Sequence, residues 1–273
     1  RAHCIYGLRK GHDITLAPPT IQDEEAAFAP CDAVIISNAT AFRLEAFQRL
    51  QELGRPYVFF VHDYWPVCRW RLFFPMNGKC RCYLKDRWLP ILLGARLLIW
   101  LSPLHRQSWL WACPELEPRP HVLVPSPVDG GAFHDLGLPR DGVVAVNSMM
   151  AFKGRANIVQ WVRDHPQEKV TLVGGDESPD ETLPPNATRV GVIPQHHMNE
   201  VYNRHRAFLH LPGSPMPFDR TVAEAYLAGC RVLGNELIGA LSWTFFKEGR
   251  DAVRAALADS PRLFWEAVEG ALG

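Results

Sequence analysis

The segment from Pro217 to Asn235, PFDRTVAEAYLAGCRVLGN, holds the residues whose types and spacing best suit binding chemistry. Thr221 and Glu224 have the spacing of a capping box, in which the Thr hydroxyl caps a helix and the Glu side chain reaches back to the first free amides. A helix is therefore predicted to begin at about Val222. Free amides and the helix dipole attract an anion to such a start, and Arg220 adds a positive charge beside it. We expect an anion site here, most simply for a phosphate, although a capping box alone is more often structural.

His62 and Asp63 form a second candidate site, within the sequence VFFVHDYWPVC. They follow a predicted strand (57–61), which itself follows a strand (32–37) and a helix (40–53). This βαβ succession indicates a parallel sheet, whose ligands lie off the carboxyl ends of its strands. Both side chains are candidates for a catalytic role, which the family resemblance of residues 62–66 given below implies, and Asp63 is the weaker candidate. The alternatives are a hydrogen-bonded structural histidine and an aspartate that only orients the loop or the ring.

The same alternation of strands and helices continues through the chain and predicts an α/β fold of two Rossmann-like, doubly wound parallel-sheet domains facing a cleft. The further predicted strands are 96–102, 121–124, 142–147, 169–173, 189–193, 207–211 and 231–233, and the further helices are 103–111, 156–164, 198–204 and the tail 245–272. The N-terminal domain is expected to be abbreviated, because a short strand at 3–6 is all that precedes residue 32. The Gly- and Pro-rich stretch 128–141 indicates the connection, so the predicted domains are 1–136 and 137–273, the second with C-terminal helices.

The composition is that of an ordinary soluble globular protein, with 47% hydrophobic and 21% charged residues among 273. A formal net charge of +0 and a pI of about 7.3 give no indication of nucleic-acid binding. Seven cysteines, an odd number, favour a reducing compartment, and we expect a cytoplasmic protein. The apolar run 89–101 is too short to span a bilayer but suits peripheral contact with a membrane.

A group of cysteines raises the question of a metal. Cys68, Cys80 and Cys82 lie in one basic loop, and Cys113 is a further candidate ligand. Their spacing lacks the paired C-x-x-C of the usual structural zinc sites, so no metal site is predicted. The basic residues of the loop can face an anionic acceptor or a membrane surface, or can simply be solvated.

Several segments resemble the retaining glycosyltransferases of family 4, which have the GT-B fold. The segment 224–235 is similar to the family pattern E-A-x-A-x-G-x-P-V-x-x-(S/T/N), and residues 62–66 are similar to its H-D-x-W-P. The passage ARLLIWLSPLHRQSW…HVLVPSPVDGGAF is similar to the family's A-D-x-x-I-x-x-S…V-I-x-N-G-V-D-x-x-x-F, and Lys153-Gly154 matches its K-G. The resemblance covers most of the chain from residue 32 to residue 243.

This resemblance implies roles for individual residues. Glu224 would hold the ribose of a nucleotide sugar, the amides at the helix start its diphosphate, and Lys153 the same diphosphate. The residues assigned to the donor, from the resemblance and the strand ends together, are Lys153, Gly154, Gly174, Asp219, Arg220, Thr221, Val222 and Glu224. The activity implied is retaining transfer of a sugar from a nucleotide diphosphate donor, UDP- or GDP-linked, to the hydroxyl of a glycan, lipid-linked or small-molecule acceptor. No other cofactor is expected, and the missing D-x-D motif agrees with a cationic clamp in place of a metal.

Two positions depart from the family pattern. Ser148 stands where the family has an Arg, and Met216 stands where it has a second Glu that grips sugar hydroxyls. Arg220 is a candidate replacement for the Arg and Asp219 for the Glu. These departures keep a second interpretation open, in which the chain is a catalytically inactive nucleotide-sugar or glycan-binding module with the same fold.

Overall fold

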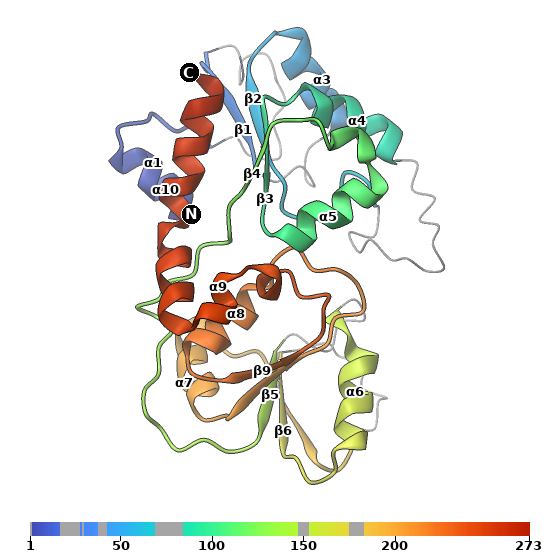
Figure 1. The fold of residues 1–273 in the computed structure, drawn as a ribbon, viewed down its shortest axis with the longest axis vertical. Coiled ribbons are helices and arrows are strands. Elements are labelled where there is room, and N and C mark those ends of the chain that lie inside the picture. Colours follow the sequence, from blue (N-terminus) through green and yellow to red (C-terminus); the bar gives the residue numbers. More distant parts are fainter. Residues whose placement is uncertain are drawn as a thin grey trace. The chain divides into compact units, whose positions relative to one another are not determined.

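The computed structural model describes residues 2–16, 28, 30–37, 43–68, 84–146, 153–174 and 183–273 (Figure 1). The chain divides into two compact units. The first comprises Arg1–Pro127 with Asp259–Gly273, and the second comprises Val128–Ala258. The division at the C-terminal end falls inside one long helix, α10 (Arg250–Leu272). This arrangement differs from the predicted domains 1–136 and 137–273 at the connection and in the placement of the last residues.

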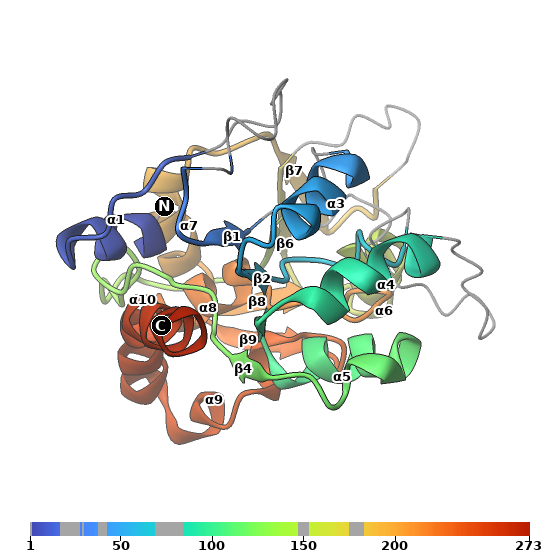
Figure 2. The same ribbon diagram turned by 90° about the horizontal axis from the view of Figure 1, so that it is seen from above.

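The first unit is built on a parallel four-stranded sheet with the order β1-β2-β3-β4. Its strands are β1 (Val34–Ile36), β2 (Tyr57–Phe60), β3 (Leu97–Trp100) and β4 (His121–Leu123), and its helices include α3 (Leu44–Glu52), α4 (Leu84–Gly94) and α5 (Pro103–Ala112), with a short 3-10 turn, η1 (Pro114–Leu116). Every residue of β2 and β3 is buried, as continuous apolar strands of a parallel sheet require. Figures 1 and 2 show α3, α4 and α5 on one side of this sheet and α1 with the C-terminal part of α10 on the other.

The start of the chain is a helix, α1 (Ala2–Arg9), so the predicted strand at 3–6 was wrong. Packing against α10 accounts for the difference: the His3 ring stacks on Phe264 at 4.3 Å between centroids, and the Trp265 indole donates to the His3 carbonyl at 2.7 Å. These contacts come from the far end of the sequence, where a local pattern gives no sign of them. The helix α4, which overlaps the start of the apolar run 89–101, was not predicted, and Pro90 in its interior weakens the helical signal.

The second unit is built on a parallel five-stranded sheet with the order β7-β6-β5-β8-β9. Its strands are β5 (Val143–Val146), β6 (Val170–Val173), β7 (Ala187–Val190), β8 (Ala207–His210) and β9 (Arg231–Gly234), and its helices and turns are α6 (Arg155–Asp164), η3 (Gln195–His197), α7 (Met198–Asn203), α8 (Arg220–Leu227), η4 (Ala240–Ser242), α9 (Phe245–Glu248) and the first part of α10. In Figure 1, α6 lies on one side of the sheet and α7 and α8 lie on the other. The chain winds outward in both directions from β5 and β8, so the topological switch point lies between these two strands.

The connection between the units ends in a network that belongs to the second one. The Arg140 guanidinium donates to the carbonyls of Tyr202, His205 and Ala228, at the ends of α7 and α8, and pairs with Asp135 at 2.7 Å. Orphan carbonyls at helix ends are thereby satisfied by one side chain. None of the described helices is long and apolar enough to cross a membrane.

Candidate functional site

The helix α8 begins two residues earlier than predicted, and its start is not a capping box. Asp219 is the N-cap residue, its side chain makes no cap hydrogen bond, and Thr221 lies inside the first turn. The backbone of Asp219 is left-handed, with φ 70°, and it is the one non-glycine residue with positive φ in the described part of the chain. Such a conformation is uncommon outside glycine and marks a position held by its surroundings. The capping-box prediction was therefore wrong, because this carboxylate turns away from the helix amides.

The Asp219 carboxylate lies between two basic side chains instead. One oxygen, Oδ1, accepts a hydrogen bond from Lys153 Nζ at 3.4 Å, and the other, Oδ2, lies 3.2 Å from His210 Nε2. Burial raises the pKa of Asp219, but the His210 ring and the Lys153 ammonium outweigh it and bring the pKa below its ordinary value. An ionised carboxylate is thus held at the switch point, where Lys153 precedes α6, His210 ends β8 and Asp219 starts α8.

Gly154 explains how Lys153 reaches this position. Its φ is 87°, and a Cβ on this residue would overlap the Leu211 carbonyl, so only glycine fits. The close approach packs the start of α6 against the end of β8, and the Ile158 amide then donates to the Gly154 carbonyl at 2.9 Å. The K-G pair is thus a lysine followed by the glycine that allows its loop to approach the neighbouring strand.

Glu224 and Arg220 lie on the first turns of α8, with different surroundings. Arg220 is exposed and lies 3.8 Å from the Glu224 carboxylate, whereas Glu224 is buried. Burial raises the pKa of Glu224, and the Arg220 charge offsets part of this rise. Burial, and after it the Glu224 charge, also raise the pKa of the Tyr202 hydroxyl well above its usual value. The structure thus places Arg220, Thr221, Val222 and Glu224 on the same helix start as Asp219.

The remaining positions named from the sequence lie elsewhere or outside the described residues. Gly174 directly follows β6 with φ 104°, and its amide donates to the Val190 and Gly191 carbonyls of the neighbouring edge segment. Met216 is buried, and its amide donates to the Leu237 carbonyl at 2.8 Å, so this apolar side chain lies inside the fold. Ser148 lies outside the described residues.

The structure describes two of the four cysteines that were considered as metal ligands. Cys68 and Cys113 are buried, and burial raises the pKa of the Cys113 thiol to about 11, whereas Cys80 and Cys82 lie outside the described residues. Among the residues that the structure describes, no three His, Cys, Asp or Glu side chains are arranged to hold a metal.

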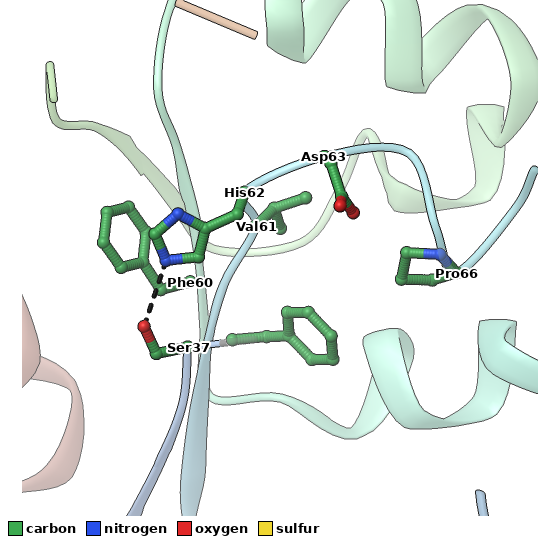
Figure 3. Close-up of a pocket in the computed structure, with 7 residues that line it drawn as sticks. Ser37, Phe60, Val61, His62, Asp63 and Pro66 are labelled. Carbon is green, nitrogen blue, oxygen red and sulfur yellow. Dashed lines mark hydrogen bonds between the residues drawn. The ribbon is translucent and has the colours of Figure 1, made fainter. Parts of the chain in front are cut away.

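His62 lines a pocket in the first unit at the carboxyl ends of β1 and β2 (Figure 3). The pocket is lined by Ser37, Phe59, Phe60, Val61, His62, Asp63 and Pro66. His62 Nε2 lies 3.0 Å from the Ser37 hydroxyl, and its ring contacts Phe60 at 4.2 Å between centroids. His62 is partly open to solvent, but the chain around the ring removes enough water to lower the pKa of His62 to about 4. The imidazole is therefore neutral at pH 7.

Asp63 does not share this arrangement with His62. The two side chains point in different directions in Figure 3, and the Asp63 Oδ1 accepts a hydrogen bond from the Trp65 amide at 2.9 Å. This contact holds the turn after β2, which was the alternative role weighed for Asp63. Ser37 was not named as a site residue, although its place as the polar end of a predicted strand was a usable signal.

Similarity to known proteins is found in the structure of the chain and not in its sequence. No protein-family model and no curated protein sequence matches the chain. The structure is similar to sucrose-phosphate synthase from Thermosynechococcus elongatus, with 18% identity and a TM-score of 0.64 over 89% of this chain and 67% of that one. It is also similar to AviGT4, a glycosyltransferase involved in avilamycin A biosynthesis, with 14% identity and a TM-score of 0.63 over 99% of this chain and 88% of that one.

A third similar structure carries a ligand. HepE of Anabaena in complex with UDP-glucose matches with 17% identity and a TM-score of 0.58 over 87% of this chain and 74% of that one. At these identities the likeness shows the fold. The chain has the GT-B fold, with two parallel-sheet α/β units of which the N-terminal sheet is the smaller.

Proposed function

We propose that the protein is a glycosyltransferase that moves a sugar from a nucleotide diphosphate donor to an acceptor hydroxyl. The observation that carries this proposal is the convergence of Lys153, Asp219 and the start of α8 at the switch point of the second sheet, the place where open α/β sheets bind their ligands. Of the similar structures, AviGT4 is a glycosyltransferase and HepE is in complex with UDP-glucose. The donor in this chain is then UDP- or GDP-linked, and the acceptor is a glycan, a lipid-linked saccharide or a small molecule.

The second unit would act mainly by electrostatic stabilisation of the departing diphosphate. Lys153, Arg220 and the free amides of α8 supply positive potential on one side of the strand ends, and charge-assisted hydrogen bonds to a diphosphate are stronger than those to neutral groups. The buried Glu224 carboxylate is the candidate acceptor for the ribose hydroxyls. No divalent metal takes part in this proposal, because the cations of the chain itself neutralise the leaving group.

The first unit would supply the groups near the reacting sugar. Retention of anomeric configuration would follow if the leaving phosphate accepts the acceptor proton while positive charge develops at the sugar. A neutral His62 suits this role, since an imidazolium would repel that charge, whereas a neutral ring and the nearby backbone carbonyls stabilise it.

A donor screen tests the proposal. Titration calorimetry with UDP- and GDP-sugars should find one donor that binds, and incubation of that donor with the protein should release the nucleoside diphosphate by transfer or slow hydrolysis. Lys153→Met should weaken binding of the diphosphate strongly, and Lys247→Met, at an exposed position of α9, is the matched control that should not. Binding without transfer or hydrolysis with every acceptor class would favour the inactive binding module, and the absence of any binding would refute both functions.

A further inference from the structure

His210 is a buried histidine for which the proposed function has no role. It ends β8 at the switch point, and 1% of its surface is exposed. Its ring packs beside Phe208, at 6.1 Å between centroids, and its Nδ1 has no hydrogen-bond partner in the described part of the chain. Its Nε2 faces Asp219 Oδ2 at 3.2 Å, without the angle of a directed hydrogen bond. Buried polar groups are normally hydrogen-bonded, so a buried ring that faces a carboxylate without such a bond indicates a specific role.

The Asp219 carboxylate needs both of its neighbours. The Asp219 side chain is 1% exposed, and a buried charge is tolerated only when it is paired. Lys153 approaches Oδ1 and His210 approaches Oδ2, so each oxygen has one partner of its own. Asp219 also has the left-handed backbone that starts α8, which ties the carboxylate to the helix whose first amides belong to the proposed diphosphate site.

We infer that His210 is a positioning residue, which fixes the Asp219 carboxylate and through it directs the Lys153 ammonium to the diphosphate of the donor. The inference rests on the proposed donor site. His210 acts on the donor only through Asp219 and Lys153, so its effect falls on the phosphates and leaves the nucleoside untouched. When the diphosphate draws Lys153 toward itself, His210 keeps Asp219 paired, and the carboxylate is not left as an isolated buried charge.

Two variants separate the polarity of the His210 ring from its volume. His210→Phe fills the space of the ring but offers nothing to the carboxylate, whereas His210→Gln places an N–H donor close to the position of Nε2. Without the imidazole, the buried Asp219 Oδ2 faces no polar group, and the carboxylate should turn or take up a proton. Lys153 then loses its contact with an ordered carboxylate in the Phe variant and keeps this contact in the Gln variant.

Calorimetry with UDP, GDP and the matching nucleosides measures the effect on the ligand. We expect His210→Phe to lower the affinity for the binding diphosphate about tenfold and to leave nucleoside affinity within about twofold, and His210→Gln to restore most of the loss. In a Lys153→Met background, His210→Phe should have no further effect, because the group that it positions is gone. An equal loss in both backgrounds, or an equal loss for nucleoside and diphosphate, would overturn the inference.

Chemical labelling tests the positioning without any nucleotide. Acetylation of Lys153 under trace labelling, followed by mass spectrometry and scaled to the exposed Lys247, should be several-fold faster in His210→Phe than in the wild type and in His210→Gln. Asp219→Asn, which removes the bridging charge, should release Lys153 in the same way and serves if the Phe variant does not fold. Unchanged labelling in both variants would refute the inference, whereas a wild type that binds no nucleotide would count against the proposed function alone.

Discussion

Replacement of Gly154 by alanine should destabilise the second unit by more than its backbone conformation alone explains. A non-glycine residue in left-handed backbone costs about 1–2 kcal/mol. At Gly154, φ is 87° and the added Cβ would also overlap the Leu211 carbonyl. Forcing an extra methyl group into such a packed contact costs a further ~1–3 kcal/mol. The loss of unfolding free energy should therefore lie at about 2–5 kcal/mol for Gly154→Ala.

The matched control is Gly137→Ala in the same unit. Gly137 has φ 66° and nothing within 4 Å of its added Cβ, so this variant isolates the conformational cost of about 1–2 kcal/mol. Urea unfolding followed by tryptophan fluorescence measures both variants, with Trp161 on α6 as a reporter close to the change. If both variants lose the same free energy, the close approach of the Gly154 backbone to β8 does not exist in solution, and the reasoning about how Lys153 is placed fails with it.

Three further predictions use the same site and its surroundings. Burial raises the pKa of Glu224 in the folded state, so ionisation of this carboxyl group lowers stability above about pH 4.5. Glu224→Gln should therefore raise the melting temperature at pH 7 and, because the ribose loses its acceptor, abolish nucleoside affinity. An unchanged nucleoside affinity would exclude Glu224 from the donor site. His62→Ala should lower kcat with little change in donor affinity, while His62→Pro should lower it further because the backbone is altered, and equal kcat in all three proteins would exclude His62 from the reaction. Burial lowers the pKa of His105 to about 3 and that of His3 to about 4, so the folded protein favours the neutral form of both rings. The free energy of unfolding should therefore fall as the pH drops from about 6.5 toward 4. A melting temperature of the wild type that does not change across this range would contradict the burial of neutral rings at these two positions.

Much of the second unit could be predicted from the sequence because its elements have strong local signals. The strand ending in His210 is a short apolar run, and the helix α8 ends at Gly229, whose φ of 102° suits the predicted stop. Both features depend on a few neighbouring residues, and the structure confirms them. The GT-B fold followed from the alternation of such elements together with the family resemblance.

The start of α8 could not be predicted because it depends on contacts between segments far apart in the sequence. Local spacing favoured Thr221 as the cap, but Lys153 and His210 together hold Asp219 in a left-handed conformation at that place. His210 itself was read as part of an apolar strand. A histidine at the last position of a buried strand was the available signal. Its contact with Asp219 could not be predicted, because Asp219 comes from another loop.

The position of Arg140 has a consequence for how the second unit opens and exchanges with solvent. Its guanidinium joins the segment before β5 to the ends of α7 and α8, and an added Cβ on Gly229 would lie 2.5 Å from its Nη2. The last turn of α8 therefore cannot fray while this side chain keeps its bonds. Amide hydrogens near Ala228 and near Asp135 should consequently exchange with deuterium in one cooperative step, although more than ninety residues of sequence lie between the two segments.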